Sequence, residues 1–179
     1  MAGIDRWNAR YRAGERGPES PSPLLLEAAG GLAPGRALDL ACGAGRNALW
    51  LAARGWEVAA IDGATAAIER LRKADPRIDA RVLDLEEEPL PFADATFDLI
   101  CIIHFLHRPL FAEARRLLRP GGMIIAAIHT TRSTMNPRYT LALGDLRAFF
   151  ADWTAVIDRE NAVAELAARK VLRTTDTSP

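Results

Sequence analysis

A glycine turn that follows an acidic residue is the segment of this sequence best suited to chemistry. Residues 38–47 read LDLACGAGRN, an apolar run that passes through Gly43 and Gly45 into a polar stretch. Glycines let a backbone approach a ligand closely, and the helix expected next offers unpaired N–H groups. Asp39 lies four residues before Gly43, and its carboxylate favours an ammonium or sulfonium group over a pyrophosphate. The segment therefore predicts a turn that binds a ligand carrying positive charge.

Further acidic residues close the next two predicted strands. Asp62 follows the second strand, where a carboxylate can accept hydrogen bonds from ribose hydroxyls. Asp84 and Leu85 end the third strand and would place an acid and a backbone N–H beside an adenine ring. In an open parallel sheet, ligands bind at the carboxyl ends of the strands. These residues therefore predict a site for a nucleoside-containing ligand.

The same turn also fits the dinucleotide fingerprint. Residues 43–48, GAGRNA, match Gly-x-Gly-x-x-Gly/Ala, and Asp62 would serve a nicotinamide dinucleotide equally well. The charge of Asp39 and the second acid at Asp84 favour a positively charged, nucleoside-containing ligand over a nicotinamide dinucleotide. A nicotinamide enzyme also normally needs a further substrate domain, for which no room is expected. An NAD-dependent oxidoreductase stays open as the less favoured alternative.

Strand-like and helix-like patterns alternate from residue 36 onward, as in an α/β protein. The last two strands are joined by a short turn and must be antiparallel. The pattern predicts a doubly wound, mostly parallel sheet with flanking helices, closed by an antiparallel hairpin. The predicted strands cover 36–41, 56–61, 78–85, 97–103, 123–128, 154–159 and 164–172, and the predicted helices 3–13, 23–29, 46–54, 65–74, 109–118 and 143–151.

Three segments resemble a known family when taken in order. Residues 39–45 (DLACGAG), 89–100 (PLPFADATFDLI) and 117–122 (LLRPGG) look like motifs of the class I S-adenosylmethionine (SAM)-dependent methyltransferases. The resemblance implies a Rossmann-like fold whose seven strands are ordered 3-2-1-4-5-7-6, with strand 7 antiparallel. It also implies SAM as the cofactor and in-line transfer of its methyl group to a small-molecule nucleophile. A non-catalytic SAM-binding regulatory module is the alternative from another class.

The resemblance further implies which residues hold the cofactor. Asp62 matches the family's ribose-binding acid and Asp84 its adenine-side acid, whereas Cys42 matches an ordinary small residue and not a nucleophile. The residues expected to bind the cofactor are Trp7, Tyr11, Asp39, Ala41, Cys42, Gly43, Gly45, Asn47, Asp62, Gly63, Asp84, Leu85, Ile103 and His104.

Candidate catalytic residues follow the fourth predicted strand. His104 could accept a proton or orient the acceptor, because a histidine titrates near physiological pH; the alternative is that it only lines the cofactor pocket. Arg108 could pair with an anionic acceptor or have a structural role before a helix. An amine or hydroxyl acceptor needs a base, whereas a thiolate or chalcogen oxyanion does not. Since His104, His107 and His129 have no evident fourth partner, no metal site is expected.

A narrower resemblance concerns the acceptor. Segments 7–11 (WNARY), 45–48 (GRNA), 106–111 (LHRPLF) and 136–139 (NPRY) look like the tellurite-resistance and thiopurine methyltransferase branch. Members of that branch methylate small, soft nucleophiles. The acid-threonine-phenylalanine run that is familiar after the fifth strand is here residues 128–131, IHTT. This departure leaves the acceptor class undetermined.

Bulk properties favour a single cytoplasmic domain. The 179 residues carry 23 basic and 23 acidic side chains, without a basic run that would attract nucleic acid or an anionic membrane. The longest apolar stretch, 99–103, is too short to span a bilayer. Two cysteines do not make a disulfide framework. We expect one domain over 1–179, a monomer or homodimer, with a core at 36–172.

The N-terminal residues 1–35 are expected to cover the cofactor site with helices and a loop. Trp7 and Tyr11 lie one helical turn apart and can face inward together. The prediction is that this helix forms a lid on the cofactor; simple core packing is the alternative.

Overall fold

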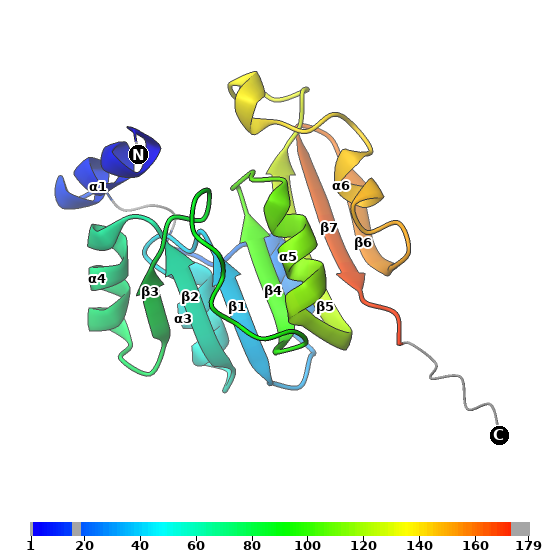
Figure 1. Ribbon diagram of the computed structural model, residues 1–179, viewed down its shortest axis with the longest axis horizontal. Helices are drawn as coiled ribbons and strands as arrows, with labels where there is room; N and C mark the ends of the chain where they lie inside the picture. The colour runs from blue at the N-terminus through cyan, green and yellow to red at the C-terminus, as the bar shows by residue number, and fades with distance from the viewer. Residues whose placement is uncertain (1, 16–18, 173–179) are drawn as a thin grey trace.

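A seven-stranded sheet with helices on both faces forms the body of the protein in a computed structural model that describes residues 2–15 and 19–172 (Figure 1). The strand order is β3-β2-β1-β4-β5-β7-β6, and β7 runs antiparallel to both neighbours, so the predicted topology is confirmed. The strands are β1 (Arg36–Leu40), β2 (Glu57–Asp62), β3 (Asp79–Val82), β4 (Phe97–Ile103), β5 (Leu118–His129), β6 (Thr154–Glu160) and β7 (Val163–Arg169). The helices are α1 (Ala2–Arg12), α2 (Pro23–Ala29), α3 (Arg46–Ala52), α4 (Thr65–Ala74), α5 (Pro109–Leu117) and α6 (Asp145–Ala148), with a short 3₁₀ helix η1 (Pro137–Tyr139).

Two apolar layers lie on opposite faces of the sheet, and β4 contributes to both. Ile100 and Ile102 pack on the face covered by α5 and α6. Leu99, Cys101 and Ile103 pack on the face covered by α2, α3 and α4. Side chains alternate between the faces of a strand, so a central parallel strand needs apolar residues throughout. In the sequence FDLICII of β4 every residue except Asp98 is apolar, and Asp98, near the start of the strand, accepts a hydrogen bond from the Arg36 N–H at 2.8 Å.

The third strand is shorter than predicted. It ends at Val82 and not at Leu85, because Asp84 closes a turn by accepting a hydrogen bond on Oδ1 from the Glu86 N–H at 3.0 Å. A carboxylate that binds the backbone two residues ahead competes with strand pairing. Asp84 and Leu85 therefore lie in the turn after β3, while Leu85 is still buried in the core.

The helix predicted at 143–151 is also shorter and covers only Asp145–Ala148. Gly144 at its N-cap has a left-handed backbone, with φ of 85°, so the helix cannot begin earlier. After Ala148 the hydrogen bonds tighten to three-residue spacing, as in the bond from the Phe150 N–H to the Arg147 carbonyl at 3.1 Å.

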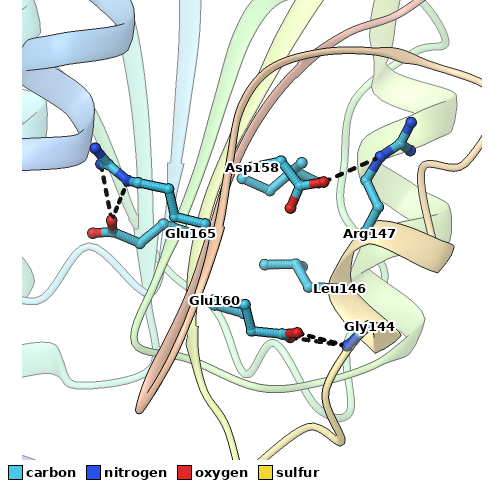
Figure 2. A pocket seen from close by; sticks show the side chains of 9 residues that line it. Gly144, Leu146, Arg147, Asp158, Glu160 and Glu165 are labelled. Atoms are coloured by element: carbon cyan, nitrogen blue, oxygen red, sulfur yellow. Dashed lines mark hydrogen bonds and ion pairs between the residues drawn. The ribbon is translucent and has the colours of Figure 1, made fainter.

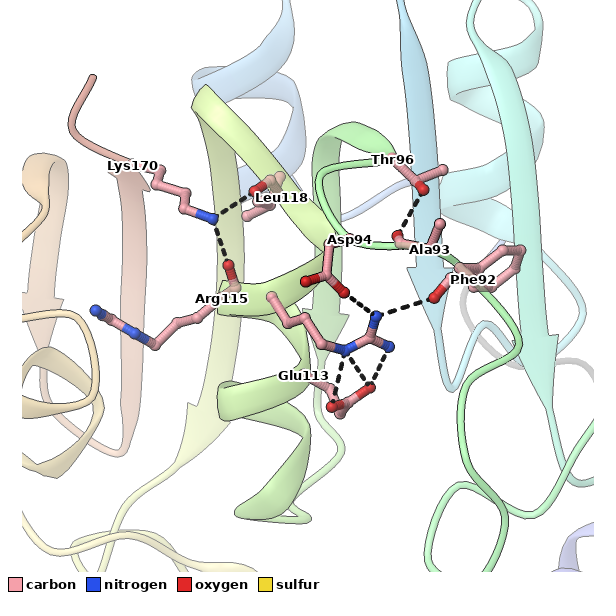
Figure 3. Close-up of polar contacts among 9 residues, drawn as sticks. Phe92, Ala93, Asp94, Thr96, Glu113, Arg115, Leu118 and Lys170 are labelled. Carbon is pink, nitrogen blue, oxygen red and sulfur yellow. Dashed lines mark hydrogen bonds and ion pairs between the residues drawn. The ribbon is translucent and has the colours of Figure 1, made fainter. Parts of the chain in front are cut away.

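Polar contacts fasten the end of α5 to its surroundings (Figure 3). The Arg116 guanidinium donates to Asp94 Oδ1 at 2.7 Å and to the Phe92 carbonyl at 3.0 Å, and so holds the segment before β4 against the helix. Lys170 Nζ donates to the Leu118 carbonyl at 2.6 Å, where α5 passes directly into β5. A cation at this point satisfies carbonyls that the helix end leaves unpaired.

Within the described residues 2–15 and 19–172, no helix is long and apolar enough to cross a membrane.

Candidate active site

The strand order reverses between β1 and β4, and this fixes where a ligand can bind. β1 pairs with β2 on one side and with β4 on the other, and both pairings are parallel. Such sheets bind ligands outside the carboxyl ends of the strands at the reversal. Ala41 after β1 and His104 after β4 both have left-handed backbones, with φ of 55° and 58°. This conformation is strained for residues with a side chain and gathers at functional sites.

Gly43 and Gly45 turn the chain from β1 into α3, and Asp62 fastens this turn to β2. Their φ angles of 56° and 86° favour glycine. The Gly43 N–H donates to Asp62 Oδ2 at 2.8 Å, and the Ala64 N–H donates to Asp62 Oδ1 at 2.8 Å. Because each carboxylate oxygen has two lone pairs, both Asp62 oxygens keep acceptor capacity for a ligand.

Asp39 is a buried acid with an unmet hydrogen-bonding need. It is 1% exposed, and within the described part of the chain its Oδ2 has no hydrogen-bond partner. Burial raises the pKa of Asp39 to about 7, although hydrogen bonds from the Ala48 N–H and Asn47 and the charge of Arg46 oppose the rise. An unpartnered buried carboxylate oxygen is costly, so a cationic ligand group would stabilise this position.

Two other residues predicted to bind the cofactor are buried behind the turn. Asn47 is 4% exposed, and its Oδ1 accepts a hydrogen bond from the Ser22 N–H at 2.9 Å, which ties α3 to the segment before α2. Cys42 is 7% exposed, and burial raises the pKa of its thiol well above the ordinary range. A thiol that stays protonated is a poor nucleophile, which agrees with the interpretation of Cys42 as a small lining residue.

The carboxyl edge continues along β2, β3 and β4. Gly63 directly follows Asp62, and the Leu83 N–H donates to the Asp62 carbonyl at 3.2 Å, which brings the turn with Asp84 beside Asp62. Ile103, 8% exposed, is the last residue of β4. The predicted cofactor residues of these strands are therefore gathered at one edge of the sheet.

Helix α1 lies against this edge, beside α4 (Figure 1). A methyl group added to Gly43 would lie 2.5 Å from the Tyr11 hydroxyl, and one added to Gly63 would lie 2.6 Å from Ile4 Cδ1. Burial and the charge of Asp62 raise the pKa of Tyr11. Both glycines are thus in contact with α1, and the lack of a side chain at each is what lets the helix come so close.

Two contacts that the sequence did not reveal dock α1 onto α4. Asn8 Oδ1 accepts a hydrogen bond from the Ala66 N–H at 3.0 Å, in the first turn of a helix whose N-cap, Ala64, has no side-chain cap. Arg70 donates to the carbonyls of Tyr11 and, at 3.0 Å, Glu15. The missing cap at Ala64 was the signal that a polar residue from elsewhere should complete α4.

Trp7 is not a core residue. It is 45% exposed, its ring centroid lies 6.1 Å from that of Tyr11, and the Arg10 guanidinium covers it at 4.3 Å. Simple core packing therefore does not describe Trp7, whereas Tyr11 does point toward the glycine turn.

On the other side of the strand reversal, His104 meets a residue that sequence analysis weighed only as a metal ligand. The rings of His104 and His129 are stacked, with centroids 5.0 Å apart and planes inclined by 28°. The register of β4 and β5 places Ile103 opposite Ala127, so the ends of the two strands bring both rings to the same edge. Arg108 is exposed at the N-cap of α5, and among the described residues it forms no ion pair that would fix it.

A cleft also lies at the other end of the sheet, beside β6 and β7 (Figure 2). This cleft of about 230 Å³ is lined by α6 and the β6–β7 hairpin. Its charged side chains have partners: Arg147 pairs with Asp158 at 3.6 Å, and Glu160 accepts a hydrogen bond from the Gly144 N–H at 2.9 Å. β4, β5 and β7 separate this edge of the sheet from β1. The cleft is therefore apart from the strand reversal, and its side chains are already satisfied.

Comparisons with known proteins point to the methyltransferases. Residues 37–122 match the family described as "Methyltransferase domain". A methyltransferase of Streptomyces halstedii, GfsG, is 31% identical over 179 aligned residues, which cover 93% of this chain and 62% of GfsG. The chain thus spans less than two thirds of that relative's length.

Solved structures show the same fold. TehB from Haemophilus influenzae has a TM-score of 0.78 at 20% identity, over 91% of this chain and 67% of TehB. The 1,6-didemethyltoxoflavin-N1-methyltransferase of Burkholderia thailandensis, solved with bound 1,6-didemethyltoxoflavin and S-adenosylhomocysteine, has a TM-score of 0.69 at 17% identity, over 94% and 87% of the two chains. The matched domain, the motif order and the sheet topology thus agree: residues 37–122 match a methyltransferase domain, and the chain has the Rossmann-like fold of SAM-dependent methyltransferases.

Proposed function

We propose that this protein transfers the sulfonium methyl group of SAM by in-line displacement to a small-molecule nucleophile. The observation that supports it most is the buried Asp39 with its unpartnered Oδ2. A carboxylate left in this state at the strand reversal fits a ligand that carries ammonium and sulfonium groups, and does not fit a pyrophosphate. SAM supplies a methyl group that is already activated for transfer.

Different residues at the carboxyl edge bind different parts of the cofactor. Asp62 accepts from the ribose hydroxyls with the lone pairs that Gly43 and Ala64 leave free. The Gly43–Gly45 turn lets the backbone approach the ligand, and Asp84 and Leu85 lie on the adenine side. Asn47 contributes by holding the segment at Ser22. Helix α1, with Tyr11 and Trp7, covers the site from above.

The acceptor enters beside β4 and β5. His104 stands at the end of β4 with a strained backbone, where it takes a proton from the acceptor or orients it. Arg108 is exposed at the start of α5 and can attract an anionic acceptor. Holding acceptor and methyl group in line can lower the barrier by about 7–11 kcal/mol in favourable cases.

Calorimetric titration with SAM, S-adenosylhomocysteine and NADH tests the proposal first. Micromolar binding of SAM and S-adenosylhomocysteine with no heat from NADH is expected. Release of S-adenosylhomocysteine in the presence of small thiol, phenol and amine acceptors then tests catalysis. Binding without transfer to any acceptor would favour a regulatory SAM-binding module, and NADH binding would favour the oxidoreductase.

A further inference from the structure

The stacked imidazoles of His104 and His129 form a built arrangement at the acceptor side of the site. Their centroids lie 5.0 Å apart. His129 Nδ1 is buried and, among the described residues, has no hydrogen-bond partner. The backbone N–H of His104 donates to the Ala127 carbonyl at 2.7 Å, which holds the left-handed backbone of His104 against β5. A strained backbone conformation such as that of His104 persists only where the surrounding structure maintains it.

Burial and the neighbouring charges favour the neutral form of the His104 ring. Burial lowers the pKa of His104 below its ordinary value, and the positive charges of His129 and of Arg46 at the start of α3 lower it further. Glu165 on β7 is the opposing influence, since its negative charge raises the pKa. Two stacked imidazoles cannot easily both be protonated, because like charges repel. Near neutral pH, His104 is therefore free to accept a proton.

The loop beside this pair presents apolar side chains to solvent. Residues 131–144 leave β5 at His129 and return to it, since the Leu141 N–H donates to the His129 carbonyl at 2.9 Å. Met135, Tyr139 and Leu143 on this loop are 43%, 42% and 40% exposed. Figure 1 shows the loop above the ends of β5 and β7. Exposed apolar residues on a loop that leaves β5 at His129 and is hydrogen-bonded back to it favour a ligand with an apolar or aromatic body.

We infer that the stacked imidazoles of His104 and His129 form a pair that receives the proton of a phenolic or enolic hydroxyl acceptor, with His104 as the base and His129 as its positioning residue. The inference rests on the proposed methyl transfer and names its acceptor class. A soft oxyanion or a thiolate is already ionised and needs no base. An uncharged amine attacks through its lone pair and needs the base only afterwards, to remove a proton from the methylated nitrogen. A hydroxyl on an aromatic body is the acceptor that gains most from this site.

The acceptor oxygen forms a bond to the methyl carbon while the carbon–sulfur bond of SAM breaks and sulfur keeps the electron pair. The proton of the hydroxyl group passes to the unprotonated nitrogen of His104. The products are the methyl ether, S-adenosylhomocysteine and the protonated imidazole, which returns its proton to solvent.

Two phenols separate a base from a merely structural residue. At pH 8, 4-nitrophenol is largely ionised and 4-methylphenol is not. With 4-methylphenol, we expect His104→Asn to lower kcat about 10²-fold or more. With 4-nitrophenol, the loss should be about tenfold or less, because that acceptor needs no base. Equal losses on both phenols would overturn the role of His104 as base.

The pair itself is tested at His129. His129→Phe keeps a ring on which His104 can stack but removes the titratable imidazole. The inflection in the pH profile of kcat/KM should therefore move to higher pH, while kcat/KM at pH values above the inflection should stay the same. His129→Ala removes the ring and should lower kcat about tenfold. His107→Phe, which removes the third histidine, is the matched control and should change neither value.

NMR titration of the His104 ring measures the coupling without any acceptor. The pKa of His104 should rise in His129→Phe and stay unchanged in His107→Phe; no rise in His129→Phe would overturn the pair. If the protein binds SAM and methylates thiols or amines but neither phenol, the acceptor class is wrong and the proposed methyl transfer stands. If the protein does not bind SAM, the proposed function fails at calorimetry.

Discussion

The Tyr11 hydroxyl lies over Gly43, at a distance where a methyl group on the glycine would stand 2.5 Å from the oxygen. The helix that carries Tyr11 also touches Gly63 through Ile4 and caps α4 through Asn8. One N-terminal helix therefore contacts the residues after β1 and after β2. Helix α1 therefore lies beside Asp62, as a lid over the proposed ribose site would.

Deletion of residues 1–13 is expected to weaken SAM binding about tenfold, because it removes Tyr11 and exposes the Gly43 turn to water. Calorimetry of the shortened chain against the full chain measures the change. Thermal unfolding of both chains serves as the control for folding. Equal SAM affinity in a folded shortened chain would contradict the lid.

Gly43→Ala is expected to weaken SAM binding about tenfold and to lower the free energy of unfolding by ~1–2 kcal/mol, since a side chain in the left-handed region is strained. Gly144→Ala is the matched control. Gly144 has a similar backbone, with φ of 85°, but open space around it. Both variants should lose stability in denaturant titrations, and only Gly43→Ala should lose SAM affinity. If both bind SAM as the wild type does, Gly43 is a turn residue and nothing more.

Asp62→Ala should weaken SAM binding roughly 10–100-fold, the effect of losing charge-assisted hydrogen bonds worth about 1.5–3 kcal/mol. The carboxylate also holds the Gly43 and Ala64 N–H groups, so the glycine turn loosens as well. Cys42→Ala serves as the comparison and should leave SAM affinity intact. Unchanged affinity in Asp62→Ala would place the ribose elsewhere.

Much of the fold was predictable because its signals are local. β4 is apolar except for Asp98, and Pro109 begins α5 as a proline at the first helical turn should. The boundary of β3 was not, because the Asp84 turn competes with strand pairing through a single side-chain hydrogen bond. Strand patterns average over several residues and cannot register one such bond.

The site was predictable in part for a related reason. Asp39, Asp62 and the glycines follow strands directly, so topology alone brings them together. The contact of Asn8 with Ala66 joins residues 58 positions apart, and the stacking of His104 on His129 depends on how β4 and β5 end. Nothing in local spacing encodes either contact. The first contact holds α1 beside the glycine turn, and the second holds His104 at the end of β4.

Asp39 gives the molecule a pH dependence with a definite sign. Its pKa is raised from 3.8 to about 7 by burial, so the folded state binds the proton more tightly than the unfolded state does. This group therefore favours folding at low pH, and its contribution is lost as pH rises from about 4 to about 7. Asp39→Asn removes the titration and should be more stable than the wild type at pH 8 by about 1–3 kcal/mol. At pH 5 the difference should be smaller, which denaturant titrations at both pH values will measure.

The same substitution should act in the opposite direction on the cofactor. A cationic ligand beside Asp39 favours the ionised carboxylate, so SAM affinity of the wild type should rise between pH 6 and pH 8, and that of Asp39→Asn should rise less. A variant that is more stable but binds SAM more weakly is the expected signature of a residue kept for function. If Asp39→Asn gains stability and binds SAM as tightly as the wild type, the buried charge does not face the cofactor.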